Sequence, residues 1–130
     1  MRAFVLVPIV LAIAVAIGFA ICRAIGFQTH TREMIAAAMA CLVAAELAGA
    51  PLVLARGADQ AATAQAALVG TVIHLFISVA FAAVVILGHV GLGPAFLYWL
   101  LGLYWVSLVV LVAAFSKAVR SAPITQPSNR

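Results

Sequence analysis

Residues 46–78 read ELAGAPLVLARGADQAATAQAALVGTVIHLFIS, and this stretch decides how the chain folds. An apolar segment that carries Glu46 runs into a short polar turn, RGADQ, at residues 56–60. A second apolar segment follows and carries a few polar residues, among them His74. A short turn between two apolar helices makes them antiparallel neighbours. The stretch therefore predicts a helical hairpin with polar side chains placed inside apolar helices.

The composition places this hairpin in a membrane. Hydrophobic residues make up 68% of the 130 residues and charged residues only 8%, far from the average soluble protein. A soluble chain of this size would expose large apolar patches. A helix that crosses a bilayer needs about 20 apolar residues, and the chain contains four such stretches. We therefore predict an all-α integral membrane protein, a bundle of four transmembrane helices.

The four spans can be placed from the apolar runs and the polar breaks between them. Together they form one domain over residues 1–120, and a polar tail, residues 121–130, is expected to be disordered because it has few apolar side chains. The alternation of polar and apolar residues that is typical of a membrane β-barrel is missing from the sequence. The predicted spans are residues 3–27, 33–55, 62–88 and 95–116.

Basic residues near the span ends predict the orientation. With four spans, both termini and the Arg56 turn lie on one side of the membrane. That side holds more basic residues than the other, which has only Arg23 and Arg32. Basic residues are enriched in cytoplasmic loops and can contact anionic headgroups, so both termini are expected in the cytoplasm. The basic residues on this side are Arg2, Arg56, Lys117, Arg120 and Arg130.

Glu46 is the first candidate for a functional residue, because it is the one carboxylate in the interior of a predicted span, whereas Glu33 stands at the start of one. It lies about ten residues before the Arg56 turn, on the order of 15 Å along a helix. His74 lies at a similar distance beyond that turn, so the two side chains are expected at the same depth, where they can meet. A charged carboxylate at that depth costs at least ~2.5 kcal/mol. We therefore expect Glu46 to face the bundle, either as an ion or partner contact or as a hydrogen-bonded structural residue.

A polar stripe of four residues marks the third span. Their spacing puts them on one side of a helix. The stripe predicts a buried polar contact with a partner or an ion, or side chains that bond to their own helix. The residues of the stripe are Gly70, Thr71, His74 and Ser78.

Small residues recur at every fourth position on the first two spans. Such rows allow helices to approach closely. They predict packing within the chain or a contact surface for another membrane protein. The rows are Ala12, Ala16 and Ala20; Gly18, Cys22 and Gly26; and Ala40, Ala44 and Ala48.

The sequence lacks the motifs that are typical of several kinds of activity. Cys22 and Cys41 are far apart and lack histidine neighbours, so no metal site is expected. No nucleophile with a neighbouring base is recognisable, so we expect no enzyme activity and no cofactor. A basic stripe with interleaved aromatics is missing as well, which argues against nucleic acid as a partner. His30 and His89, both near the outer face, leave a haem as an alternative.

The third and fourth spans resemble ATP synthase protein I, a family of small four-helix membrane proteins encoded beside the F-type ATP synthase in many bacteria. Members carry a Gly-Glu-x-x-Lys pattern early in the third span, and this chain has Gly70-Thr71-Val72-Ile73-His74 there. The glycine is kept, Thr71 replaces the acid and His74 holds the basic position. One hypothesis is that the acid has moved to Glu46. The resemblance covers roughly residues 35–118 and implies a factor of the bacterial inner membrane that helps assemble the c-subunit ring, with a further role in divalent-cation supply.

These observations lead us to expect a non-catalytic accessory or assembly protein with the lipid bilayer and ATP synthase membrane subunits as partners. One alternative is a small ion- or proton-coupled transporter or channel, a homo-oligomer that uses Glu46. The other alternative is a membrane anchor subunit that holds a redox partner.

Overall fold

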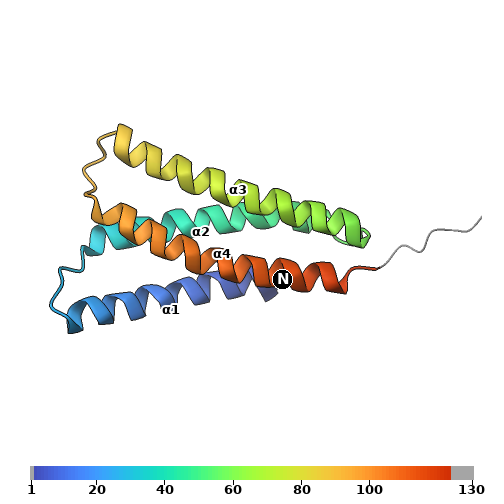
Figure 1. Cartoon of the computed structure of the whole chain (residues 1–130), viewed down its shortest axis with the longest axis horizontal. Coiled ribbons are helices and arrows are strands. Elements are labelled where there is room, and N and C mark those ends of the chain that lie inside the picture. Colours follow the sequence, from blue (N-terminus) through green and yellow to red (C-terminus); the bar gives the residue numbers. More distant parts are fainter. Residues whose placement is uncertain (1, 124–130) are drawn as a thin grey trace, which may run out of the picture.

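The computed structural model describes residues 2–123, with side chains from residue 7 onward. Its four helices confirm the all-helical prediction (Figure 1). The last helix continues past the predicted end of its span, and most of the predicted disordered tail lies outside the described residues. The helices are α1 (Arg2–Ala24), α2 (Thr31–Leu54), α3 (Gln60–Leu87) and α4 (Ala95–Ser121).

The polar turn between α2 and α3 forms for local reasons. Gly57 adopts a φ of +82°, a conformation that glycine tolerates better than other residues. Asp59 then caps α3, because its side chain accepts a hydrogen bond of 2.8 Å from the backbone N–H of Ala62. The N–H of Gln60 also donates to the carbonyl of Pro123, 3.1 Å away. This bond ties the start of α3 to the residues that follow α4.

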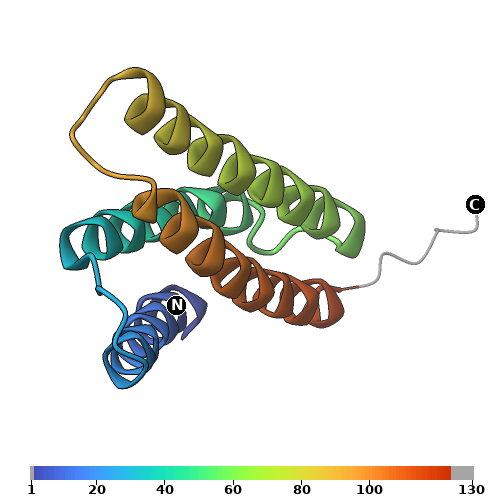
Figure 2. The same cartoon turned by 60° about the vertical axis from the view of Figure 1, so that its left-hand side comes forward.

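Helices α2 and α4 form the centre of the structure. Each contacts all three other helices, whereas α1 and α3 lie on opposite sides and do not touch within the described part of the chain. Figures 1 and 2 show α3 and α4 lying closest near the turn that holds Asp59 and diverging toward the loop at residues 88–94. The predicted hairpin is therefore present as α2 and α3, and α4 packs against both of its helices.

Small side chains on α2 permit this packing. Ala40, Ala44 and Ala48, the predicted row, are all buried. Opposite them, Gly70 of α3 is so close that a Cβ atom there would overlap the carbonyl oxygen of Ala48. Close backbone approach of this kind is what small residues provide between apolar helices. On α2, the small residues thus serve packing within the chain.

The alanine row on α1 is exposed, unlike the buried row on α2. Ala12, Ala16 and Ala20 are exposed on the outside of the four-helix structure. The buried contacts of α1 come from Val7 and Leu11 and from Gly18, where a Cβ would come within 2.7 Å of the Trp99 ring on α4. The alanine row of α1 therefore takes no part in the core.

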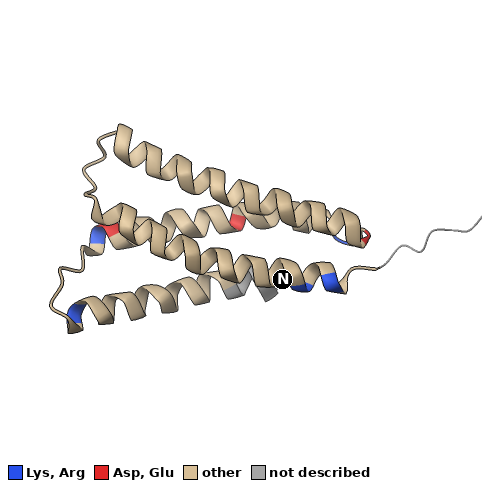
Figure 3. Cartoon of the chain, viewed as in Figure 1, with Lys and Arg blue, Asp and Glu red and all other residues tan. Residues whose placement is uncertain are grey.

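All four helices are long and apolar enough to cross a membrane. Many large apolar side chains lie on the outside, such as Ile13, Phe76 and Val109. The charged residues gather toward the two ends of the structure, except for one acidic position along α2 (Figure 3). This arrangement is typical of a multi-pass membrane protein.

The contact at Gly70 gives a test of the packing. Gly70→Ala should lower the free energy of unfolding by about 1–3 kcal/mol, because α3 must move away from the Ala48 carbonyl. Unfolding of the purified protein in mixed detergent, followed by circular dichroism, measures this change.

Gly102→Ala is the matched control. A Cβ atom at Gly102 meets nothing within 4 Å, so that variant should be as stable as the original or gain up to about 1 kcal/mol from helix propensity. Equal effects of the two substitutions would contradict the close approach of α3 to α2.

Candidate functional site

The polar stripe predicted on α3 is largely internal. Gly70, His74 and Ser78 are buried on one face of the helix, which they share with Thr63 and Ala67. Thr71 lies beside this face and is half-buried. Its hydroxyl donates to the carbonyl of Ala67, 3.0 Å away, which is the self-bonding expected of threonine within a helix.

His74 forms the centre of a polar contact between α3 and α4. Its side chain is fully buried, and its Nε2 atom lies 3.1 Å from the hydroxyl of Ser107 on α4. The imidazole also stacks on the Tyr104 ring, with 5.0 Å between the ring centroids and 21° between the planes. The partner of His74 is therefore on α4 and not on α2.

The hydrogen bonds of Ser107 indicate how His74 is protonated. The Ser107 hydroxyl donates to the carbonyl of Tyr104, one helical turn back, over 2.9 Å. Because a hydroxyl has a single proton, Ser107 can then only accept from His74. Both bonds form together when the imidazole carries its proton on Nε2. In the neutral ring, Nδ1 is then a bare acceptor.

Two buried polar atoms have no hydrogen-bond partner among the described residues. They are Nδ1 of His74 and Oγ of Ser78. These residues are one turn apart on the same face of α3. Buried polar atoms are nearly always bonded, so this pair of unpaired atoms is unusual for the interior of a protein.

Glu46 does not face the bundle, and the expectation that it meets His74 is wrong. Its side chain is exposed and makes no hydrogen bond or ion pair with the described residues. The reason is angular. Ala44 and Ala48 are fully buried, and a residue two positions from each is turned by about 200° around the helix. Glu46 therefore points away from α3, although Gly70 lies beside Ala48 and the depths agree.

The surroundings of Glu46 are apolar. Met39, Val43 and Leu47 are exposed on the same outward side of α2. Glu46 also lines a small hollow together with Val7 of α1 and Leu111 of α4. The outer face of α2 thus presents one carboxylate within an apolar surface.

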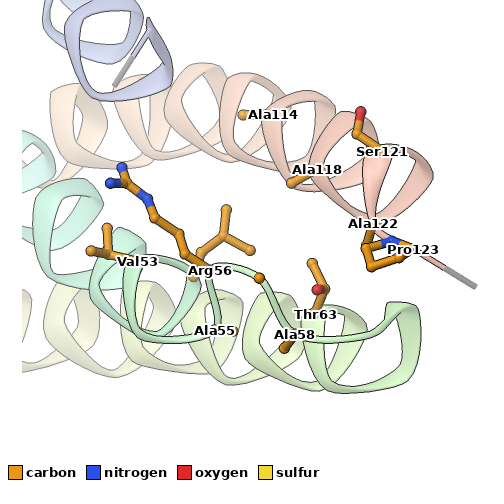
Figure 4. Close-up of a pocket in the computed structure, with 12 residues that line it drawn as sticks. Val53, Ala55, Arg56, Ala58, Thr63, Ala114, Ala118, Ser121, Ala122 and Pro123 are labelled. Atoms are coloured by element: carbon orange, nitrogen blue, oxygen red, sulfur yellow. The ribbon is translucent and has the colours of Figure 1, made fainter. Parts of the chain in front are cut away.

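Three of the five basic side chains that the structure describes lie at the end where α2 turns into α3. A pocket of about 430 Å³ lies there, with Arg56 and Thr63 on one side and Ser121 and Pro123 on the other (Figure 4). Lys117 and Arg120 are exposed on α4. The side chain of Arg2 lies outside the described residues.

The two loop histidines do not form a shared site. His30 and His89 both adopt positive φ angles, 41° and 49°, and they line different pockets. The described residues contain no group of three or more potential metal-ligating side chains. Cys41 is buried, with its sulfur 3.9 Å from the Leu100 carbonyl, and Cys22 is a free thiol as well. No haem position is indicated by this geometry.

Ser107 and Tyr104 complete the polar contact, and Ser107 was missed from the sequence. A signal for it exists, since Ser107 is a polar residue in an apolar helix, three positions after Tyr104. Residues three apart share a helix face. The spacing does not say which residue on α3 they meet.

Comparison of the chain with protein-family models, with curated protein sequences and with solved structures gives no match. The resemblance to ATP synthase protein I therefore remains an expectation from the sequence, and the site is interpreted from its own geometry.

The His74–Ser107 contact predicts a specific pattern of stability. Ser107→Ala should destabilise the protein by about 1–3 kcal/mol, because it leaves the buried Nε2–H of His74 without an acceptor. Ser116→Ala, at an exposed position on the same helix, should change stability by less than about 0.5 kcal/mol. Unfolding in mixed detergent measures both.

The double variant His74→Phe/Ser107→Ala separates pairing from other effects. Its loss should be smaller than the sum of the single losses, since both partners are removed together. Strict additivity would mean that the two side chains do not interact.

Proposed function

We propose that the chain is an integral protein of the bacterial inner membrane, with four spans and both termini in the cytoplasm. The four long apolar helices and their exposed apolar side chains support the membrane placement. Arg56, Lys117 and Arg120 lie at one end of the structure, and Arg23 and Arg32 lie at the other (Figure 3). The excess of basic residues on the first end supports its assignment to the cytoplasm.

We further propose that the protein is a non-catalytic accessory or assembly factor, which docks a helix of a membrane complex on the outer face of α2. The observation that carries this proposal is Glu46, which is exposed among apolar side chains. It lies well inside the span and has no partner among the described residues. In a bilayer, an uncovered carboxylate at such a depth costs at least about 2.5 kcal/mol. A partner helix that offers a basic or hydrogen-bond-donating side chain offsets this cost.

The polar stripe of α3 is not part of this docking surface, because its residues are used inside the chain. The proposed surface instead combines Glu46 with Met39, Val43 and Leu47, which lie on the same side of α2. Apolar side chains around one charged group suit a transmembrane partner, because the surrounding contacts exclude both lipid and water from the ion pair.

The complex that we propose is the F-type ATP synthase, and the partner helix belongs to its c-subunit ring or its other membrane subunits. The support is the resemblance over residues 35–118. A carboxylate that is exposed on the outward face of a helix is also what a homo-oligomeric transporter would need. The two readings differ in what contacts Glu46: a foreign helix in the first case and a second copy of the chain in the other.

The role of Glu46 can be tested by affinity purification from native membranes in mild detergent, followed by mass spectrometry. The original chain should recover ATP synthase membrane subunits. Glu46→Gln should reduce their recovery about 10-fold or more, because loss of the charge removes a charge-assisted contact of about 1.5–3 kcal/mol.

Glu33→Gln is the control, since Glu33 lies in the first turn of α2, near the end of the helix. It should recover as much partner as the original chain. Recovery of the protein alone as a homo-oligomer would overturn the assembly role, and flux through reconstituted vesicles that Glu46→Gln abolishes would replace it with transport.

The orientation is tested by fusing reporters to the chain end at residue 130. A reporter active only in the cytoplasm should be active there, and a reporter active only in the periplasm should be inactive. The same pair placed in the loop at residues 88–94 should give the reverse result. A periplasmic chain end would contradict the orientation.

A further inference from the structure

A groove lies between α3 and α4. The two helices diverge toward the loop at residues 88–94 (Figures 1 and 2). The groove measures about 340 Å³, which is within the usual range for small-molecule sites. Its walls are apolar: Leu75, Val79 and Ala82 come from α3, and Leu97 and Leu101 come from α4. The groove thus has the size and the lining of a site for an apolar molecule.

Polar groups interrupt this apolar lining at one place. Ser78 lines the groove, is 5% exposed, and its hydroxyl has no hydrogen-bond partner among the described residues. Tyr104 lines it as well, and its ring stacks on His74. His74 does not itself line the groove: it is 0% exposed, it stacks on the groove residue Tyr104, and its Nδ1 atom has no hydrogen-bond partner among the described residues. Nδ1 of His74 and Oγ of Ser78 are the two unpaired atoms described above.

We propose that this groove binds a lipid-soluble molecule with a hydroxyl group, such as an isoprenoid or long-chain alcohol. Side chains four residues apart on a helix have Cβ atoms about 5–6 Å from each other. An oxygen atom that makes two hydrogen bonds of about 2.8 Å can join polar atoms on neighbouring turns of a helix. A hydroxyl both donates and accepts, so a single one can donate to His74 Nδ1 and accept from Ser78 when the Tyr104 ring, which lines the groove and stacks on His74, moves aside.

The apolar part of the ligand fits the remaining wall. Leu75, Val79 and Leu101 are each about half exposed, at 46%, 57% and 58%, so the groove is open along its side. The hydroxyl binds at the deep end beside Ser78, and the apolar chain lies along the leucine and valine side chains. In a bilayer, such a ligand enters sideways from the lipid. The inference rests on the proposed membrane placement, and it does not depend on the partner that docks at Glu46.

Binding of farnesol to the purified full chain in lipid nanodiscs tests the proposal, with farnesyl methyl ether as the matched probe. The ether keeps the acceptor oxygen and lacks the proton. The alcohol should bind about 2–12-fold more tightly, the value of one hydrogen bond. Native mass spectrometry over a range of probe concentrations gives both affinities.

Variants assign the two hydrogen bonds. His74→Phe should remove the preference for the alcohol, because the acceptor is lost. Ser78→Ala should weaken both probes about 2–12-fold, because both accept from this hydroxyl. Ser116→Ala, outside the groove, should bind both probes as the original chain does.

A third variant tests whether binding can be lost while the fold is kept. Ala82→Leu fills the groove, so it should abolish binding of both probes while the helical content stays unchanged. Equal binding of alcohol and ether by the original chain would overturn the proposal, because it would mean that a water molecule satisfies the two polar atoms. Reporter fusions test the membrane placement separately, so a failed binding experiment and a failed placement are distinguishable.

Discussion

The structure depends on the close approach of α3 to the small-residue face of α2. Gly70 lies against the carbonyl of Ala48 without room for a Cβ atom. Ala44 and Ala48 supply a flat surface that brings the two backbones together, and α4 packs against both helices. Helices in an apolar solvent gain little from burying apolar side chains and depend on such packing instead. The position of each polar residue follows from this contact, because it determines which side of α2 and α3 faces inward.

The contact sorts the polar residues into two kinds of environment. On α3 it turns His74 and Ser78 inward, where His74 bonds to Ser107. On α2 it turns Glu46 outward, since that residue is opposite the buried alanines. His74 joins two helices of the same chain and Ser78 borders the groove, and each has one polar atom without a partner among the described residues. The outward carboxylate is free to meet another molecule. The helix-docking surface and the ligand groove that we propose are therefore separate places on the molecule.

Much of the fold was predictable from the sequence, and the pairing of side chains was not. Four long apolar runs separated by polar breaks predicted the four helices because helix length and hydropathy are local properties. The depth of Glu46 and His74 followed from counting residues away from the turn. The directions in which these two side chains point depend on the helix face that each residue occupies. The row at Ala40, Ala44 and Ala48 already placed Glu46 on the opposite face of its helix. The contact between His74 and Ser107 depends on how α3 and α4 cross. The spacing of residues along the sequence does not determine that crossing.

The position of α1 bears on the order in which the structure is completed. This helix comes before the others in the chain, yet it contacts only α2 and α4, and its Gly18 receives the ring of Trp99 from α4. During synthesis, the contact between α1 and α4 can form only after α4, the last of the four helices, has left the ribosome. Until then, α1 has only α2 as a neighbour within the described part of the chain, and the side of α1 that will pack against α4 is uncovered.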